Sequence, residues 1–173
     1  VEVYQVLAEY YEKKKDSVNL AAILEKGRRI YPTNGYWDEI ELKTISEKGN
    51  KAELYAHYDA LIAKKPNEYT LNYNYAIELY NCIYTPDKRP ANETELKAKL
   101  TTVLKNTIAL DKGIDATVLM TNHLYNVAAD LSTAGTMIKG IKPEDKNKKA
   151  ELKKKKKEKM DECIAYCNSA ITW

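Results

Sequence analysis

The sequence predicts an all-α fold built from repeated helix hairpins. Residues 20–34 and 54–68 align at an offset of 34 residues, and Pro32 and Pro66 close the two segments. Apolar residues in both segments recur at i, i+4 and i+7, the spacing that places them on one side of a helix. Proline ends each segment because it lacks a backbone N–H and crowds the preceding turn.

Turn-forming residues divide each repeat into two short antiparallel helices. Asp16 or Ser17 can cap the second helix of the first unit, since both side chains accept hydrogen bonds from free backbone N–H groups. Gly49 can adopt the left-handed conformation that ends a helix. A single hairpin cannot bury its apolar side alone, so we expect the hairpins to stack.

Composition sets the broad class of protein. The chain has 173 residues, 44% of them hydrophobic and 31% charged, with 6 Gly and 5 Pro, which excludes collagen-like and wholly disordered chains. Mean hydropathy is −0.59, and no apolar run approaches the roughly 18 residues of a membrane span, so we expect a soluble protein. Because the chain begins with Val1, an N-terminal segment is expected to have been removed. The compartment therefore stays open between cytoplasmic and periplasmic or secreted.

The first two units resemble the tetratricopeptide repeat family. That resemblance rests on a pattern of aromatic, leucine and small residues ending in proline. In the first unit it comprises Tyr4, Leu7, Ala8, Tyr11, Leu20, Leu24, Gly27 and Pro32, and in the second Leu42, Ile45, Leu54, Tyr58, Leu61 and Pro66. It implies a right-handed α-solenoid that forms one domain over residues 1–173. About four units are implied, over residues 1–34, 35–68, 69–114 and 115–173.

The last two units are expected to carry insertions, over residues 85–95 and 133–159. Core positions of the third unit are Tyr75, Ala76, Leu79, Leu100, Leu104, Thr107 and Ile108, with Pro86 and Pro90 marking the break and Lys112 at the usual proline position. In the fourth unit the first helix is expected to end at about Ser132, before a flexible loop and a lysine-rich stretch. Its inward residues are predicted to be Val118, Tyr125, Ala128 or Ala129, Cys163, Cys167 and Ala170.

The resemblance also implies a binding surface, because first helices line a concave groove in tetratricopeptide arrays. The groove residues it predicts are Tyr36, Glu39, Lys43, Tyr73, Asn74, Ile77, Tyr80 and His123. Tyrosine gives a large contact area at low entropic cost, so the expected function is a non-catalytic scaffold that binds a protein or peptide. The alternative is that exposed tyrosine is simply the default aromatic residue of a chain with 14 Tyr and no Phe.

Two other functions compete with peptide binding. A structural or oligomerisation module could pair two copies through Trp173 and the last helix. A nucleic-acid or acidic partner could instead bind residues 146–159, where nine lysines face only Glu151 and Glu158. No aromatic residue interrupts that run, so base stacking is not offered and nucleic acid is disfavoured.

The sequence offers little for catalysis or metal binding. It contains no glycine-rich phosphate loop and no His-Glu-x-x-His motif, so we expect no enzyme and no cofactor. Cys163 and Cys167 share a helix side, but His57 and His123 lie in different units, so no metal site is predicted. Three cysteines cannot all pair and imply no disulfide framework.

Overall fold

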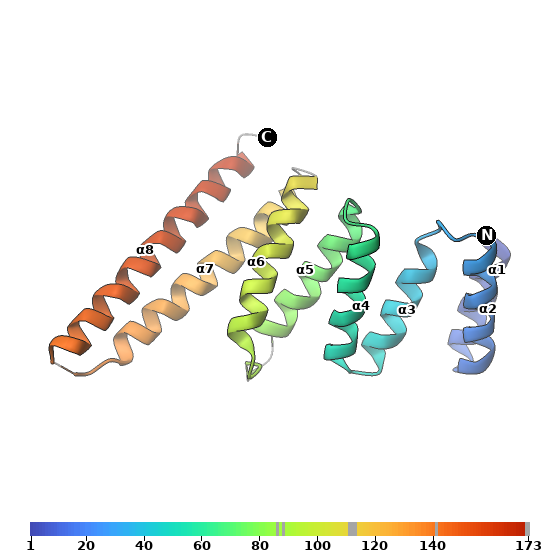
Figure 1. Cartoon of the computed structure of the whole chain (residues 1–173), viewed down its shortest axis with the longest axis horizontal. Helices are drawn as coiled ribbons and strands as arrows, with labels where there is room; N and C mark the ends of the chain where they lie inside the picture. The colour runs from blue at the N-terminus through green and yellow to red at the C-terminus, as the bar shows by residue number, and fades with distance from the viewer. Residues whose placement is uncertain (86, 88, 111–113, 141, 172–173) are drawn as a thin grey trace. The chain divides into compact units, whose positions relative to one another are not determined.

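The computed structural model describes residues 1–85, 87, 89–110, 114–140 and 142–171. These residues form eight α-helices that pack as four consecutive antiparallel pairs, so the predicted all-α fold of helix hairpins is confirmed (Figure 1). The helices are α1 (Glu2–Lys13), α2 (Ser17–Ile30), α3 (Tyr36–Glu47), α4 (Lys51–Lys64), α5 (Tyr69–Tyr84), α6 (Glu93–Leu110), α7 (Ile114–Met137) and α8 (Pro143–Ile171). No helix in this part of the chain is long and apolar enough to span a membrane.

The helices belong to two compact units, Val1–Lys64 and Lys65–Trp173. The first contains the hairpins α1–α2 and α3–α4, and the second contains α5–α6 and α7–α8. The boundary falls four residues from the predicted junction between the second and third repeats, at residue 68. A single domain over residues 1–173 stays a prediction.

Turns of the first unit lie where local sequence signals predict them. The side chain of Asp16 caps α2, because its Oδ1 accepts a hydrogen bond of 3.1 Å from the backbone N of Asn19. Lys15 has a φ of 56° and Gly49 a φ of 75°, so both turns pass through the left-handed region. Pro32 and Pro66 lie in the connections that follow α2 and α4.

A glycine and a tryptophan fix the contact between the first two hairpins. Trp37 is buried, and its indole Nε1 donates a hydrogen bond of 3.0 Å to the carbonyl of Tyr31. Its ring lies so close to Gly27 that a methyl group built on this glycine would overlap the ring. A side chain larger than that of glycine at position 27 would therefore require the buried Trp37 ring to move.

The second unit has a core drawn from α5, α6 and α7. Of the core residues predicted for the third repeat, Ile108 is half-buried and the others are buried, namely Tyr75, Ala76, Leu79, Leu100, Leu104 and Thr107. Helix α5 ends at Tyr84 and α6 begins at Glu93, so the last three residues of the predicted insertion 85–95 are helical. Three residues on which predictions rest, Pro86, Lys112 and Trp173, lie outside the described residues.

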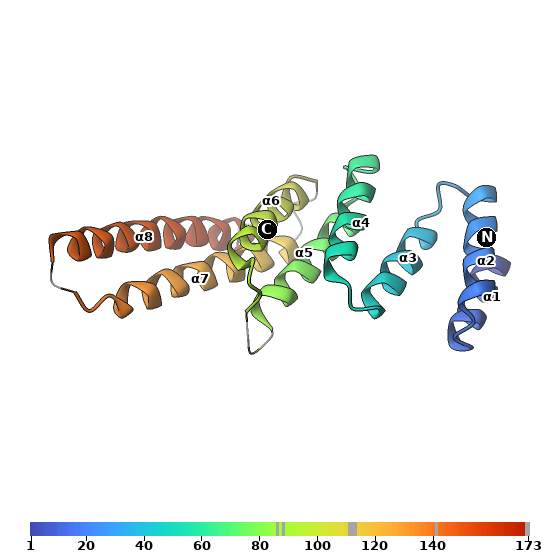
Figure 2. The same ribbon diagram turned by 60° about the horizontal axis from the view of Figure 1, so that its bottom comes forward.

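The flexible loop predicted after Ser132 is wrong. Helix α7 continues to Met137 and α8 begins at Pro143, so most of residues 133–159 belong to a long antiparallel hairpin (Figure 2). Hydroxyl groups that sequence reasoning assigned to a loop instead bond within the helix, as the Thr133 hydroxyl does to the carbonyl of Ala129 at 3.1 Å. Packing against α8 stabilises the extension, and Lys156 donates a hydrogen bond of 3.1 Å to Ser132.

Predicted inward positions of the fourth unit are wrong on α7 at two places. Val118 and Tyr125 are exposed to 45% and 59%, respectively. The side chains that face the core are Ala116, Thr117, Met120, His123, Leu124 and Ala128. The helix is therefore turned relative to the repeat alignment. Small apolar residues occur on several sides of α7, so its sequence did not identify the inward side. On α8, Cys163 is buried as predicted, whereas Cys167 and Ala170 are half-buried.

Candidate functional site

The predicted groove residues lie on the first helix of three hairpins, α3, α5 and α7. Glu39, Lys43 and Asn74 are exposed, whereas four others, Tyr36, Tyr73, Ile77 and Tyr80, are half-buried. The eighth residue, His123, is fully buried. Helix α3 belongs to the first unit and α5 and α7 to the second, so the predicted residues of each unit are described by themselves.

In the first unit, polar side chains join α1 to α3. The Tyr36 hydroxyl donates a hydrogen bond of 3.2 Å to the backbone carbonyl of Gln5. Lys43 forms an ion pair of 2.7 Å with Glu12. These two contacts link the first helices of two successive hairpins.

This surface of the first unit is acidic. Burial raises the pKa of Tyr36, and the carboxylates of Glu9, Glu12 and Glu39 raise it further. The pKa of Lys43 is also raised, because its ammonium group is hydrogen-bonded to Glu12. An arrangement of three carboxylates around a tyrosine hydroxyl favours basic groups on whatever it contacts.

In the second unit, aromatic residues follow one side of α5 along its whole length. We call this row the tyrosine ridge; it consists of Tyr69, Tyr73, Ile77, Tyr80 and Tyr84, and all five side chains are half-buried. The rings of Tyr69 and Tyr73 are stacked with centroids 5.7 Å apart. Those of Tyr80 and Tyr84 lie 4.8 Å apart. The ridge is thus a row of ordered rings rather than a set of independent side chains.

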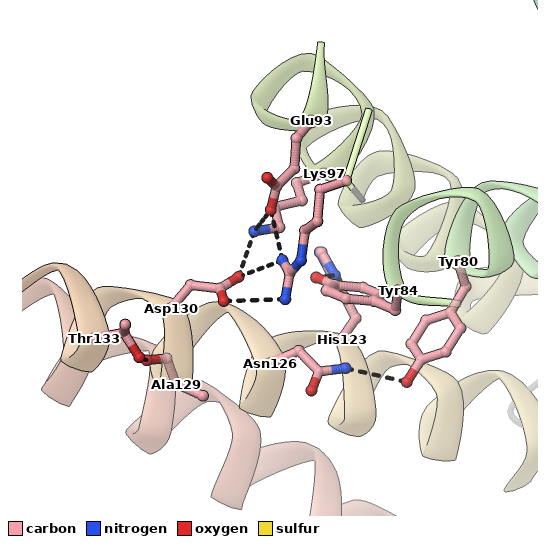
Figure 3. Close-up of polar contacts among 10 residues, drawn as sticks. Tyr80, Tyr84, Glu93, Lys97, His123, Asn126, Ala129, Asp130 and Thr133 are labelled. Carbon is pink, nitrogen blue, oxygen red and sulfur yellow. Dashed lines mark hydrogen bonds and ion pairs between the residues drawn. The ribbon is translucent and has the colours of Figure 1, made fainter. Parts of the chain in front are cut away.

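Helix α7 supports the tyrosine ridge from one side. The Asn126 side-chain amide donates a hydrogen bond of 3.1 Å to the Tyr80 hydroxyl (Figure 3). Burial raises the pKa of Tyr73, and the nearby carboxylate of Asp115 adds to this effect. As in the first unit, first helices of successive hairpins meet through polar groups at the edge of the predicted surface.

His123 does not offer a contact surface, which corrects the prediction that it lines the groove. Its Nδ1 lies 2.8 Å from the Tyr84 hydroxyl, and its Nε2 lies 2.8 Å from the Thr101 hydroxyl. The Thr101 hydroxyl also donates to the carbonyl of Lys97 at 2.9 Å. Since that uses its only proton, Thr101 accepts from Nε2–H, and Tyr84 donates to Nδ1.

The buried environment keeps His123 neutral. Burial lowers its pKa to about 4, and the positive charges of Lys97 and Lys159 act in the same direction. Burial has the opposite effect on Tyr84, whose pKa it raises, and the carboxylate of Asp130 raises that pKa further. A neutral histidine whose two ring nitrogens are both bonded is a structural link between α5, α6 and α7.

A cluster of four charged residues lies beside this histidine (Figure 3). Arg89 binds both carboxylate oxygens of Asp130, at 2.7 and 3.1 Å, and Lys97 contacts the same carboxylate at 2.5 Å. Arg89 and Lys97 also each pair with Glu93. Partial burial acts to raise the pKa of Asp130, but the bonds and charges of Lys97 and Arg89 outweigh it, and the pKa is lowered.

This charged cluster anchors the connection between α5 and α6 to α7. The Arg89 guanidinium and the Lys97 ammonium lie 5.2 and 5.7 Å from the centre of the Tyr84 ring, where cations are attracted to the ring face. Sequence reasoning missed Tyr84, Arg89 and Asp130. Tyr84 could have been found, because it follows Tyr73, Ile77 and Tyr80 at helical spacing, whereas the 41 residues between Arg89 and Asp130 gave no signal.

Two cavities adjoin the helices, and His123 is the one predicted groove residue among the residues that line them. One of about 650 Å³ in the first unit has an apolar floor that includes Leu20, Leu24 and Ile45, beside the ion pair of Arg28 and Glu41. A second, of about 460 Å³, lies between α6, α7 and α8 in the second unit.

The described residues contain no group of three or more His, Cys, Asp or Glu side chains placed to hold a metal ion. All three cysteines are free. The thiol of Cys163 donates to the carbonyl of Thr121 at 3.5 Å, and its pKa is raised by burial and by Cys167.

No family model, curated protein or solved structure shows significant similarity to the chain.

Proposed function

We propose that this protein is a non-catalytic scaffold that binds a protein or peptide segment through the exposed side of its first helices. The observation that carries the proposal is the tyrosine ridge on α5, where four tyrosines and Ile77 form one ordered row. Tyrosine side chains supply large contact areas with few rotatable bonds, and their hydroxyls can bond to a ligand backbone. A preformed row reduces the entropy that binding costs.

We further propose that the hairpins stack as a right-handed solenoid of the tetratricopeptide type. Contacts between successive first helices support it, since Tyr36 bonds to Gln5 of α1 and Asn126 of α7 bonds to Tyr80 of α5. The glycine contact with Trp37 also matches the small-residue position of that family. In such an array, first helices share one surface, and the ligand would lie across them.

Partner capture tests the proposal directly. Replacing Tyr73 and Tyr80 with Ala removes the two ring contacts at the centre of the ridge, and we expect the amount of captured partner to fall at least tenfold. Tyr166→Ala is the matched control, because it removes a half-buried tyrosine from α8, a second helix of the same unit. Far-UV circular dichroism should be the same for all three proteins. Equal capture of partner by the double variant and the wild type would contradict the proposal.

A further inference from the structure

Helix α7 carries apolar residues on a side that the other helices of the second unit leave exposed. Ile114, Val118 and Tyr125 are exposed to 54%, 45% and 59%. Their spacing of i, i+4 and i+11 places them in one row along the helix. His123 and Leu124, by contrast, point into the core with α5 and α6. The row is also separate from the tyrosine ridge, which belongs to α5.

Helix α8 carries a matching row in its C-terminal half. Met160, Ile164, Cys167 and Ile171 recur at i, i+4, i+7 and i+11. Ile164 and Ile171 are exposed to 51% and 80%, whereas Met160 and Cys167 are half-buried. An exposed isoleucine is common by itself, but a row that continues along three turns of helix makes an extended apolar surface.

Both rows border the same side of the α7–α8 hairpin. Cys163 points at α7, where it bonds to Thr121, and Glu162 points toward α6, where it pairs with Lys105 at 3.5 Å. Ile164 and Ile171 therefore lie on the edge of α8 away from α6. Because the helices run antiparallel with Cys163 opposite Thr121, successive residues of the two rows lie at the same levels: Met160 beside Tyr125, Cys167 beside Val118 and Ile171 beside Ile114. We call these two rows together the end face.

Lysines continue the α8 row toward the N-terminus of the helix. The same side of α8 carries Lys146, Lys149, Lys153 and Lys157. Lys149 is half-buried, and the other three lysines are exposed. The carboxylate of Glu151 lies on the opposite side, where it pairs with Lys155 at 2.6 Å. The surface is therefore apolar at one end and basic at the other.

We propose that the end face docks an amphipathic α-helix of a partner protein, whose apolar stripe continues into a run of acidic residues. The groove between two antiparallel helices accepts the apolar side of a third helix at i, i+3 and i+4 spacing. Acidic residues at one end of that helix would meet the four lysines and fix its direction. This site is independent of the proposed tyrosine surface.

Two other occupants of this surface, a second copy of the chain and a membrane, are disfavoured by the arrangement of its charged and apolar residues. Two copies packed in parallel through α8 would set lysine against lysine, and antiparallel packing would set lysine against the apolar row. A helix that lies on a membrane separates its apolar and basic residues around the helix axis, so that all the apolar residues reach one depth. On α8 the two kinds of residue are separated along the axis instead.

Fluorescence anisotropy with two stapled helical peptides tests the proposal on the whole chain. Each 20-residue peptide carries leucines along one half of a stripe; the other half of that stripe carries glutamates in one peptide and lysines in the other. We expect the acidic peptide to bind at least tenfold more tightly than the basic one. Replacing Tyr125 and Ile164 with Asp should weaken acidic-peptide binding at least tenfold. Val18→Asp, at a residue of α2 that is 77% exposed, should leave it unchanged.

Charge reversal provides the second arm. Lys153→Glu with Lys157→Glu should weaken the acidic peptide and strengthen the basic one, which loss of folding cannot do. Failure of the acidic peptide to bind, or equal binding of both peptides, would overturn the proposal. It would also be overturned by self-association that Ile164→Asp abolishes, or by tighter binding to phosphatidylserine vesicles than to the acidic peptide. None of these outcomes bears on the tyrosine ridge, so failure here leaves the proposed function standing.

Discussion

His123 couples the stability of the second unit to pH. It is fully buried, bonded to Tyr84 and Thr101, and has a pKa of about 4. An unfolded chain would bind a proton at this histidine near pH 6.5, whereas the folded protein resists doing so until about pH 4. The unfolded state therefore gains protons first as the pH falls, and stability is lost between these two values.

We expect the second unit of the wild type to lose about 3 kcal/mol of stability between pH 7 and pH 4 through this residue. In His123→Gln, which keeps a donor and an acceptor but does not titrate, this part of the pH dependence should disappear. The measurement is hydrogen exchange of α7 amides in moderate urea across this pH range. Identical pH profiles for the two proteins would contradict the assignment of this pH dependence to His123. His57 is present in both proteins, so its contribution is the same in both profiles.

Single residues also show which structural roles can be predicted from the sequence and which cannot. Asp16 and Gly49 were predicted correctly because their roles depend on the backbone within three residues of them. The burial of His123 depends on Thr101 and Tyr84, which lie 22 and 39 residues away in the chain. No local pattern reports such a contact, so the sequence placed this histidine on an exposed side.

At the scale of helices, the contact of Gly27 with Trp37 sets the approach of α2 to α3. Replacing a helical glycine with alanine normally stabilises a helix by about 0.5–1 kcal/mol. At Gly27 the added methyl group would overlap the buried indole ring, so we expect Gly27→Ala to destabilise the first unit by about 1–3 kcal/mol.

Gly135→Ala is the matched control, since nothing lies within 4 Å of a methyl group at this position of α7. It should be neutral or slightly stabilising. Urea unfolding followed by circular dichroism compares the two variants. A stabilised Gly27→Ala protein would mean that the two hairpins are not held by this contact.

Helix boundaries followed the sequence where proline or glycine marked them, as at Pro32 and Pro66. They did not in the last hairpin, where the residues between Ser132 and the lysine-rich stretch were predicted to form a flexible loop. Residues 133–137 instead continue α7, because α7 and α8 lie against each other and such packing outweighs low intrinsic preference. The prediction of the inward side of α7 was wrong for a related reason: Val118 and Tyr125 fit the repeat pattern, but packing leaves both exposed.

Across the whole molecule, the surfaces of the two units differ in chemistry. An acidic surface around Tyr36 belongs to the first unit, and the second unit presents the tyrosine ridge together with a basic half of α8. A chain with a net charge of +3 thus has regions of strong and opposite charge. The repeat pattern predicted helix hairpins and most of the ridge, but not the end face, since it assigned Val118, Tyr125 and Cys167 to the core.

Photo-crosslinking from the ridge tests the central claim most directly. Asn74 is an exposed residue of α5 beside Tyr73, and Asn106 is an exposed residue of α6, the second helix of the same hairpin. A photoreactive amino acid at Asn74 is expected to crosslink a protein or peptide that the same group at Asn106 does not, and Tyr73→Ala with Tyr80→Ala should abolish that product. Equal crosslinking from both positions, or a product that survives the tyrosine substitutions, would contradict binding through the first helices.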